Sequence, residues 1–297
     1  MANMTQFLWL SLGFFLGLLC MLTAGPRGVV EQCPQLHRHV ARDVDSSILQ
    51  FGNPGPISDL LKRDEYVASY NRRDRVPNWV GEHLTKQSLI PGPDVSRKNS
   101  QFTEDTSIPA LFRALLSDYR GSGYDRGHMA PAADAVATQQ AMNQTFLLTN
   151  MCPQVGVGFN RNYWAYFENF CRDLTNNFTD VYVYTGPLFL PQKNGGGQFD
   201  KRGRAEYTMT YSLLGEANVA VPTHFYKVIL IPQGDTYASA AFVLPNQAIP
   251  SETHLMDFKV DLQAIEKASG LVYFDQLDRS QFTDLCDITT CEVKRYQ

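Results

Sequence analysis

The stretch "YDRGHMAPAAD", residues 124–134, sets an acid, an arginine, a glycine and a histidine in a row near the middle of the chain. A second glycine-bearing stretch, "YRGSG" (119–123), precedes it, and Pro131 follows the histidine closely. A histidine of an ordinary core rarely lies between a charged pair and a helix breaker. His128 is therefore a candidate general base or metal ligand, with an ordinary turn as the remaining interpretation.

Around this stretch the composition is that of a globular protein. The chain has 297 residues, 44% of them hydrophobic, which is enough to bury a full core in one large domain. Its net charge of −4 lacks the basic footprint that usually marks a nucleic-acid binder. A phosphate-binding function would need local clusters such as "NRRDR" (71–75) and "SRK" (96–98), for which solvated loop charge is the alternative explanation.

The N-terminal segment is apolar from Phe7 to about Leu22 and carries no charge before Arg27. Its length lies between that of a signal-peptide core and that of a short membrane anchor. We therefore expect a hydrophobic leader or anchor over residues 1–24, a linker over 25–50 and a folded domain over 51–297.

Six cysteines are scattered along the chain, and none forms a CxxC pair. A structural zinc site is therefore not expected. Cys286 and Cys291 are close enough in sequence to form a disulfide in an oxidising compartment, with free thiols as the alternative.

Apolar periodicity predicts an α+β fold around an antiparallel or mixed sheet, because strands and helices do not alternate as βαβ units. Strands are expected over residues 65–71 and 78–84, paired as a hairpin, and over 145–154, 181–190, 207–214, 225–231 and 239–244. Helices are expected over 107–120, capped by Ser107, over 159–178, and over 261–270, between Asp261 and Gly270.

The helix over 159–178 carries a buried stripe formed by Trp164, Phe167, Cys171, Leu174 and Phe178. The spacing of Asn160, Trp164 and Glu168 places these three on roughly one side of it. An asparagine oxygen suits Mg²⁺, and a carboxylate can hold the waters of that ion. Residues eight apart in a helix lie about 12 Å apart, so Asn160 must lie in a bend at the helix start to share one ion with Glu168.

Taken singly, Asn160 could be a helix cap and Glu168 a surface residue. Together, "DRGH" (125–128), Asn150 and the N-x-x-x-W-x-x-x-E pattern over 160–168 resemble the DNA/RNA non-specific endonucleases of the ββα-metal fold. The resemblance is to the mitochondrial endonuclease G branch, especially its fungal members, and runs from about Phe51 to the C-terminus. It includes "TGPLFLP" (185–191) and "VAVPTHFYKVI" (219–229). It implies an α+β, ββα-metal fold with a central antiparallel sheet flanked by helices.

The resemblance also implies a mechanism of Mg²⁺-dependent phosphodiester hydrolysis, with Mn²⁺ as a substitute ion. His128 would be the general base that activates water. Asn160 would be the single direct protein ligand of the metal, and Glu168 would orient the waters of the metal.

Four further residues receive supporting roles from the same resemblance. Arg97 would stabilise the charge on phosphorus in the transition state. Arg126 and Asn150 would support the site, and Asp125 would help to hold the turn and the base.

Because the nucleophile is water, no 2′-hydroxyl is needed, so DNA and RNA can both be substrates, with little sequence preference. The resemblance further implies a homodimer in the mitochondrion, at the inner membrane or in the intermembrane space. Membrane association would occur through the N-terminal segment. The uncharged start of the chain leaves the secretory pathway as an alternative.

Two other functions compete with this interpretation. A relative of the same fold could hydrolyse nucleotide pyrophosphates or phosphodiesters, and a catalytically silent homologue could only bind nucleic acid. The presence of both a base, His128, and a metal ligand, Asn160, argues against a silent homologue.

Overall fold

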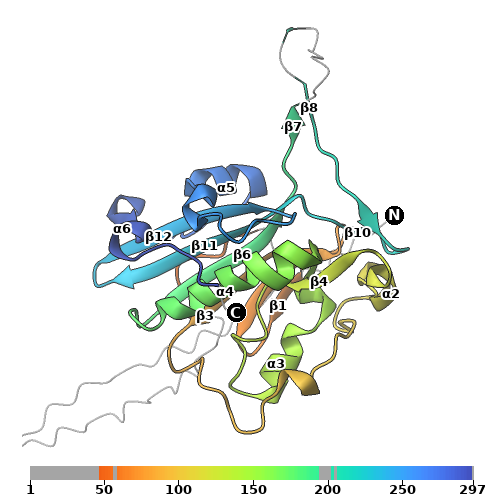
Figure 1. Ribbon diagram of the computed structural model, residues 1–297, viewed down its shortest axis with the longest axis horizontal. Helices are drawn as coiled ribbons and strands as arrows, with labels where there is room; N and C mark the ends of the chain where they lie inside the picture. The colour runs from red at the N-terminus through yellow and green to blue at the C-terminus, as the bar shows by residue number, and fades with distance from the viewer. Residues whose placement is uncertain (1–46, 56–58, 194–201, 204–205, 296–297) are drawn as a thin grey trace, which may run out of the picture. The chain divides into compact units, whose positions relative to one another are not determined.

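The computed structural model describes residues 47–55, 59–193, 202–203 and 206–295 (Figure 1). All of them belong to one compact unit, Ala41–Gln297. The expected leader (1–24) and most of the expected linker (25–50) lie outside the described residues. No helix among the residues described has the length and apolar character that a membrane span needs.

The described residues are organised around an eight-stranded sheet in which all pairs but one are antiparallel. This confirms the expected α+β fold with a central antiparallel sheet. Its order is β1 (Asp59–Lys62), β2 (Tyr66–Asn71), β3 (Val76–Leu84), β6 (Val181–Leu188), β11 (His224–Gln233), β12 (Thr236–Pro245) and β13 (Lys259–Val260), with β14 (Phe282–Asp284) parallel to β12.

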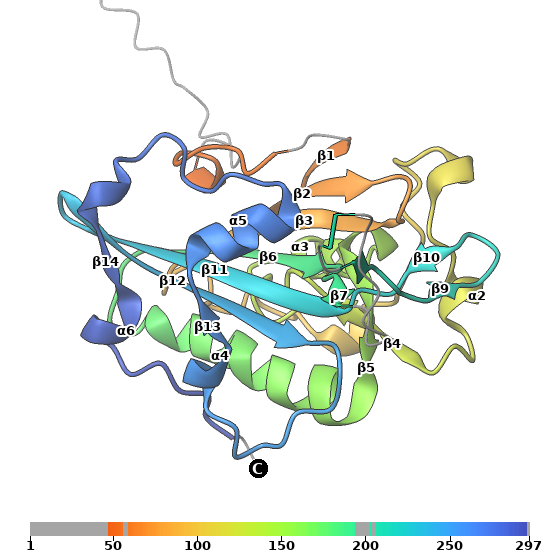
Figure 2. The same ribbon diagram turned by 90° about the horizontal axis from the view of Figure 1, so that it is seen from above.

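Each face of the sheet is covered by a helix, and Figure 2 shows α4 (Trp164–Leu174) and α5 (Leu262–Ser269) on opposite sides. Neighbouring residues of a strand point to opposite faces. Val80 therefore joins the hydrophobic cluster that contains Trp164 of α4, while Trp79 joins the cluster that contains Ile265 of α5. The two clusters are the two halves of the core.

The strands β3 and β6 are neighbours in the sheet, with Leu84 opposite Val181, although almost a hundred residues separate them in the chain. The residues between them, 85–180, form one long excursion from the sheet. The excursion carries α2 (Leu116–Tyr119), β4 (Tyr124–His128), α3 (Gln139–Thr145), β5 (Met151–Val155) and α4. Outside the main sheet, β4 pairs with β5 in antiparallel fashion. All seven candidate site residues lie in this excursion.

Several expected elements are confirmed. The hairpin over 65–71 and 78–84 is β2 paired with β3, and three of the other expected strands are β6, β11 and β12. The expected C-terminal helix is α5. The side chain of Asp261 accepts a hydrogen bond from Gln263 N at its start, and Gly270 ends it in the left-handed conformation.

The expected helix over 107–120 is wrong. Only a 3₁₀ turn (Ala110–Phe112) and the four-residue α2 form there. The Ser107 hydroxyl donates to the Asp105 carboxylate at 2.6 Å and does not cap a helix. The guanidinium of Arg113 donates to the carbonyls of Ile108 and Thr106, so local side-chain bonds compete with the helix.

Three other expectations need correction. The expected strand over 145–154 begins only at Met151, after the end of α3 and a 3₁₀ turn. The expected strand over 207–214 consists of two short pieces, β8 (Tyr207–Thr208) and β9 (Leu213–Leu214). Helix α4 ends at Leu174, before Phe178. Cys286 and Cys291, left open between disulfide and thiols, are bonded to each other.

Candidate active site

A cavity of about 560 Å³ opens on the excursion, next to the β4–β5 pair and the start of α4. Six of the seven candidate site residues line it: Arg97, Asp125, Arg126, His128, Asn160 and Glu168. Residues up to 71 positions apart in the chain thus share one opening. The seventh candidate, Asn150, is fully buried beside the cavity.

Asn150 holds the segment that follows His128. Its side chain donates to the carbonyls of Ala130 and Thr145 and accepts from the backbone N–H of Ala130. All three bonds lie between 2.8 and 2.9 Å and are buried. Asn150 therefore supports the end of β4 through the backbone and does not face the cavity.

A glycine is required at position 127, next to His128, because β4 packs closely against a side chain of β5 there. A Cβ at this position would lie 1.9 Å from Oε1 of Gln154, a fully buried side chain on β5. The absent side chain lets β4 approach Gln154, and the strand then ends with His128 at the cavity.

His128 is buried, with only 7% of its surface exposed. Its ring packs edge-on against Phe146, with centroids 4.9 Å apart, and lies 5.6 Å from the ring of Phe102. Burial, reinforced by the positive charge of Arg97, lowers the pKa of His128 from 6.5 to about 3. The imidazole is therefore neutral, as a general base must be, across the physiological pH range.

The two ring nitrogens of His128 differ in their surroundings. Nε2 is buried and has no hydrogen-bond partner among the described residues. Because His128 lines the cavity, Nδ1 is the nitrogen that can meet water there. The neutral tautomer that accepts a proton at Nδ1 carries its own hydrogen on Nε2.

The same two aromatic rings also position two arginines. The guanidinium of Arg126 stacks 4.2 Å from the centroid of Phe102, and that of Arg97 lies 5.1 Å from the centroid of Phe146. Such cation–π contacts favour a fixed orientation without neutralising the charge. Arg97, Arg126 and His128 therefore all contact the same pair of aromatic rings, Phe102 and Phe146.

Asn160 lies in the bend that the sequence required. The turn Gly156–Tyr163 is π-helical and precedes α4, and Val157 and Gly158 within it have non-helical torsions, with φ of +84° at Gly158. This bend lets Asn160 and Glu168 line the same cavity. Trp164, expected on their side, is instead fully buried in the core. Asn160 does not cap a helix: no side chain caps the start of this turn or of α4, and the amide of Asn160 donates to Asp125.

Asp125 orients the Asn160 side chain. Its carboxylate accepts from Nδ2 of Asn160 at 2.9 Å and from Nε and Nη2 of Arg161 at 2.7 and 2.5 Å. The Arg161 bonds, with burial opposing, lower the pKa of Asp125. A Cβ at Gly156 would lie 2.9 Å from this carboxylate, so glycine makes room for it. Asp125 thus contacts the candidate metal ligand and was expected to hold the base.

Glu168 borders a group of buried charges that we did not predict. Burial raises its pKa to about 7, and the nearby charges of Lys227 and Arg172 oppose that rise. Lys227 is only 1% exposed and donates to the hydroxyl of Thr185 at 2.8 Å. Glu82, only 2% exposed, has its pKa raised well above 4.5 by burial. A charged residue at a core-facing position of an apolar strand, as in "HFYKVILI", is the signal that could have revealed them.

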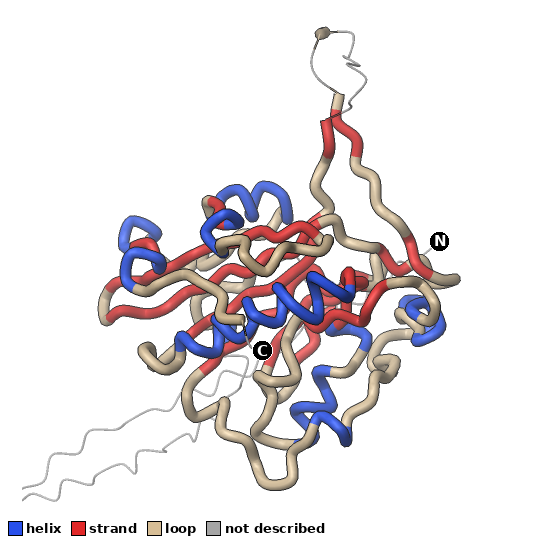
Figure 3. Tube along the Cα trace, viewed as in Figure 1, coloured by secondary structure: helices blue, strands red, loops and turns tan. Residues whose placement is uncertain are grey.

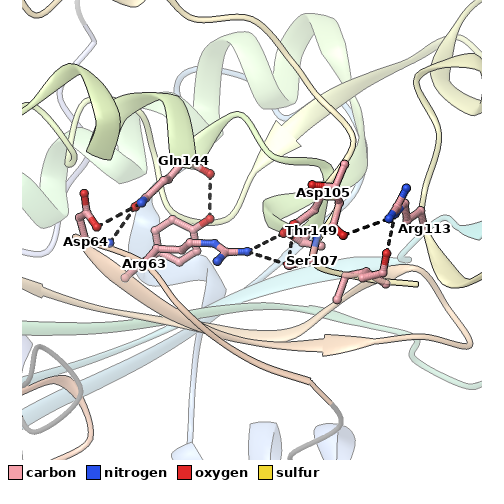
Figure 4. A network of polar contacts seen from close by, with 10 residues as sticks. Arg63, Asp64, Asp105, Ser107, Arg113, Gln144 and Thr149 are labelled. Carbon is pink, nitrogen blue, oxygen red and sulfur yellow. Dashed lines mark hydrogen bonds and ion pairs between the residues drawn. The ribbon is translucent and has the colours of Figure 1, made fainter. Parts of the chain in front are cut away.

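A second polar network connects the excursion to the first strands of the main sheet (Figure 4). The buried carboxylate of Asp105 accepts from Arg63 at 2.6 Å, from the Ser107 hydroxyl at 2.6 Å and from Thr149 at 2.7 Å. Thr149 is the neighbour of Asn150. The network therefore ties the β1–β2 turn to the segment that positions the end of β4.

The donor set of the cavity fits Mg²⁺. Because Nδ2 of Asn160 is bonded to Asp125, the amide oxygen is the end free to meet a cation. Glu168 adds carboxylate oxygens to the same cavity. Neutral and anionic oxygens are the ligands this ion prefers, and it keeps most of its waters. A cavity of about 560 Å³ has room for them, since one water occupies about 30 Å³.

Comparison with known proteins identifies the family of this chain. Residues 44–280 match the model of the DNA/RNA non-specific endonuclease family. The chain is 63% identical over 248 residues to nuclease C1 of Cunninghamella echinulata var. echinulata, covering 83% of this chain and 95% of that protein. It is 47% identical over 255 residues to the mitochondrial nuclease of Saccharomyces cerevisiae, covering 84% and 75% of the two.

Among solved structures, a crystal structure of an EndoG/EndoGI complex superposes with a TM-score of 0.77 at 42% identity. The match covers 82% of this chain and 96% of that one. The ββα-metal fold and the endonuclease G branch, both expected from the motifs, are confirmed. The chain is a hydrolase of the nuclease class, and it belongs to the DNA/RNA non-specific endonuclease family.

Proposed function

We propose that this protein is a Mg²⁺-dependent endonuclease that hydrolyses DNA and RNA, with His128 as the general base and Asn160 as the protein ligand of the metal. The observation that carries the proposal is the shared cavity. A neutral, buried imidazole and a free amide oxygen line the same opening beside two arginines.

His128 supplies the proton transfer. Nδ1 accepts the proton of a water molecule in the cavity as the oxygen attacks phosphorus. The ester bond between phosphorus and the leaving oxygen breaks, and that oxygen takes a proton from solvent. The burial that lowers its pKa keeps the ring neutral before the reaction, and Phe146 and Phe102 hold its plane. The proton can return to solvent through the open side of the cavity.

The remaining residues bind and orient. A bound Mg²⁺ would supply positive charge beside the scissile phosphate. Asp125 fixes the amide of Asn160 with its oxygen free, and Glu168, in its carboxylate form above its raised pKa of about 7, accepts hydrogen bonds from water in the cavity. Arg97 forms no ion pair within the described part of the chain, so its guanidinium can bind phosphate oxygens. Arg126, stacked on Phe102, adds a second cation.

The wider proposal follows the family. Catalysis by water without base-specific contacts makes both DNA and RNA substrates. We propose that the protein resides in the mitochondrion, as the names of the yeast relatives suggest. We also propose a homodimer, which only the family resemblance supports. Residence at the inner membrane or in the intermembrane space would follow from the N-terminal segment, and the secretory pathway is the alternative.

The activity test compares wild type and His128→Ala on plasmid DNA and on RNA, with Mg²⁺ and with EDTA. Wild type should release acid-soluble oligonucleotides from both polymers only with metal, and His128→Ala should be slower by about 10²–10⁴-fold. Release of phosphate from nucleotides alone would favour the pyrophosphatase. If both proteins bind DNA alike and neither cuts, the silent homologue is correct.

The metal test measures binding directly, by titration calorimetry with Mg²⁺ and by electron paramagnetic resonance with Mn²⁺. Asn160→Ala should abolish binding, and Asp125→Asn should weaken it by roughly 10–100-fold, because the amide loses its fixed orientation. Arg161→Gln keeps the bond between Asp125 and Asn160 and should weaken binding less. Unchanged affinity in Asn160→Ala would refute the assigned ligand.

A further inference from the structure

A buried lysine lies on the face of the main sheet that α4 covers. The ammonium of Lys227 donates to the Thr185 hydroxyl and lies 5.0 Å from the ring centroid of Trp164. Trp164 begins α4, which packs on this face (Figures 2 and 3). Both contacts are with neutral groups, and Lys227 forms no ion pair within the described part of the chain. A buried ammonium without a carboxylate in contact is costly, so charges farther away must offset it.

Two carboxyl groups of the same region interact with this cation. Thr185 is opposite Lys227 in one neighbouring strand and opposite Val80 in the other. Glu82, two residues after Val80, points to the same face of the sheet. Glu168 belongs to α4 and lines the catalytic cavity. Burial raises the pKa of both carboxyl groups, and the positive charge of Lys227 opposes that rise.

The charges of this region do not balance if every group is ionised. The charged groups that act on Glu82 are Asp134, Lys227, Glu168 and Arg172. Together with Glu82 they make three carboxylates against two cations, which leaves one negative charge in excess. Excess charge away from water is unfavourable, so the region is neutral when one carboxyl group holds a proton.

The pattern of contacts indicates that Glu82 holds this proton. Its Oε2 atom is buried and has no hydrogen-bond partner among the described residues. Asp134 instead forms an ion pair with Arg172, and Glu168 lines a cavity that water can enter. A buried oxygen without a partner costs less in a neutral carboxyl group than in a carboxylate. With Glu82 neutral and Asp134 paired, the charge of Lys227 is balanced by Glu168.

We propose that Lys227 is a positioning residue for catalysis, whose buried charge keeps Glu168 a carboxylate at the catalytic cavity while Glu82 stays a neutral acid. This inference rests on the role proposed above for Glu168. It extends that role to two residues that do not line the cavity. The sheet thereby acts on the chemistry of the excursion through charge.

The other charges around Glu168 do not replace Lys227. Arg172 and Arg97 also favour the carboxylate, and Asp134 opposes it, but Lys227 has the largest effect of the four. Arg172 is engaged by Asp134. Arg97 lines the cavity and is the cation proposed to bind phosphate, so its charge is shared with substrate. Lys227 is enclosed in the core, where its charge acts on Glu168 whether or not substrate is bound.

The test follows the ionisation of single glutamates in the full chain in mild detergent, without metal or substrate. Carbon-13 NMR of protein labelled at the glutamate carboxyl carbon reports each titration, and Glu168→Gln and Glu82→Gln assign the two signals. In wild type Glu168 should titrate at about pH 7, with Glu82 still protonated there. Lys227→Met is similar in length and uncharged, and should raise the Glu168 midpoint by about one pH unit or more.

Two further variants separate charge from packing. Thr185→Val removes the hydrogen bond that holds the ammonium but keeps its charge, so it should raise the Glu168 midpoint, by less than Lys227→Met does. The matched control is Lys259→Met, because Lys259 belongs to the same sheet, on β13, and is paired with Asp284. This control should leave the Glu168 midpoint unchanged. Circular dichroism checks that each protein is folded.

A nuclease assay then connects the charge to catalysis. If the Glu168 midpoint rises from about 7 to about 8, the carboxylate fraction at pH 7 falls about fivefold. Lys227→Met should therefore cut DNA about fivefold more slowly than wild type at pH 7 and approach wild type at pH 9. A variant that is merely less stable would not recover with pH. A raised midpoint with an unchanged rate at pH 7 overturns the positioning role.

The titrations decide the remaining outcomes. An unchanged Glu168 midpoint in Lys227→Met, or an equal rise in Lys259→Met, overturns the proposal. If Lys227→Met does not fold, an unchanged midpoint in Thr185→Val overturns it. A fall of the Glu168 midpoint in Glu82→Gln would mean that Glu82 is ionised, and overturns its assignment as the neutral acid. Because NMR needs neither metal nor cleavage, the expected titrations in a wild type that cuts no nucleic acid contradict only the proposed function.

Discussion

At the scale of single residues, His128 combines two demands that usually conflict. A base must reach water, yet this one is almost entirely enclosed by aromatic rings and faces the positive charge of Arg97. Enclosure makes protonation unfavourable, so the resting ring is neutral, and the same enclosure weakens it as a proton acceptor. Because burial opposes protonation of His128, we expect the free energy of unfolding to fall in acid.

We predict that the free energy of unfolding falls in acid because of His128. Above pH 6.5 the imidazole is neutral in both the folded and the unfolded chain and contributes no pH dependence. Below 6.5 the unfolded chain binds a proton, while the folded chain does not until about pH 3. For such a group the stability at pH 5 is lower than at pH 8 by about 2 kcal/mol.

Urea unfolding of wild type and His128→Gln at a series of pH values measures this contribution. The difference between the two curves isolates His128, because Glu168, whose pKa is raised to about 7 and whose effect has the opposite sign, is present in both. His254→Gln, at an exposed position, is the control and should follow wild type. Parallel curves for wild type and His128→Gln would show that the buried imidazole is protonated in the fold.

At the scale of elements, the pairing of β4 with β5 depends on the missing side chain at Gly127. We predict that Gly127→Ala destabilises the protein by about 1–3 kcal/mol, the usual cost of overpacking. The reason is the Cβ that would lie 1.9 Å from Gln154. Thermal unfolding of Gly127→Ala, Gln154→Ala and the double variant measures the coupling. The double variant should be more stable than the sum of the single effects implies, and strict additivity would exclude this contact as the cause.

The elements differ in how far the sequence could predict them. Strands of the main sheet were found because an apolar pattern and a buried position coincide there, as in β11 and β12. The helix expected over 107–120 is absent, since side chains such as Asp105 and Arg113 bond locally to the backbone and prevent a continuous helix. Such competition depends on the tertiary position of each partner.

The candidate site, too, could be predicted from the sequence only in part. Its residue types and spacing were recognisable, and the bend before Asn160 followed from helix geometry alone. The packing of His128 against Phe102 and Phe146 was not predictable, because those residues are near only in the fold. The bond between Asp125 and Asn160 likewise joins positions 35 residues apart, and it gives Asp125 a contact with the candidate metal ligand.

At the scale of the whole molecule, the C-terminal segment contacts α4, the helix that carries the candidate site residue Glu168. Lys294 forms an ion pair with Asp173 of α4 at 2.7 Å, and Arg295 donates to the carbonyl of Ser251. The disulfide between Cys286 and Cys291 holds the start of this segment against α6 (Leu285–Ile288). The end of the chain therefore contributes to the stability of the helix that carries Glu168.

We predict that replacing both cysteines, Cys286→Ser with Cys291→Ser, lowers the free energy of unfolding by about 2 kcal/mol, the chain-entropy value for so short a loop. Urea unfolding of oxidised wild type and the double variant measures the loss. A reductant should bring wild type to the level of the variant and leave the variant unchanged. Equal midpoints for the oxidised wild type and the variant would mean that the bond adds nothing.

The pairing of Leu84 with Val181 has a consequence for how this architecture can be altered. The chain leaves the sheet at Leu84 and returns to it at the facing Val181. All seven candidate site residues therefore lie on one insertion whose two ends are adjacent. We expect that this insertion, residues 85–180, can be exchanged between homologues by joining the chain at two points, with the order of strands in the main sheet unchanged. Chimeras joined at these two positions should transfer catalytic character while the sheet stays that of the recipient.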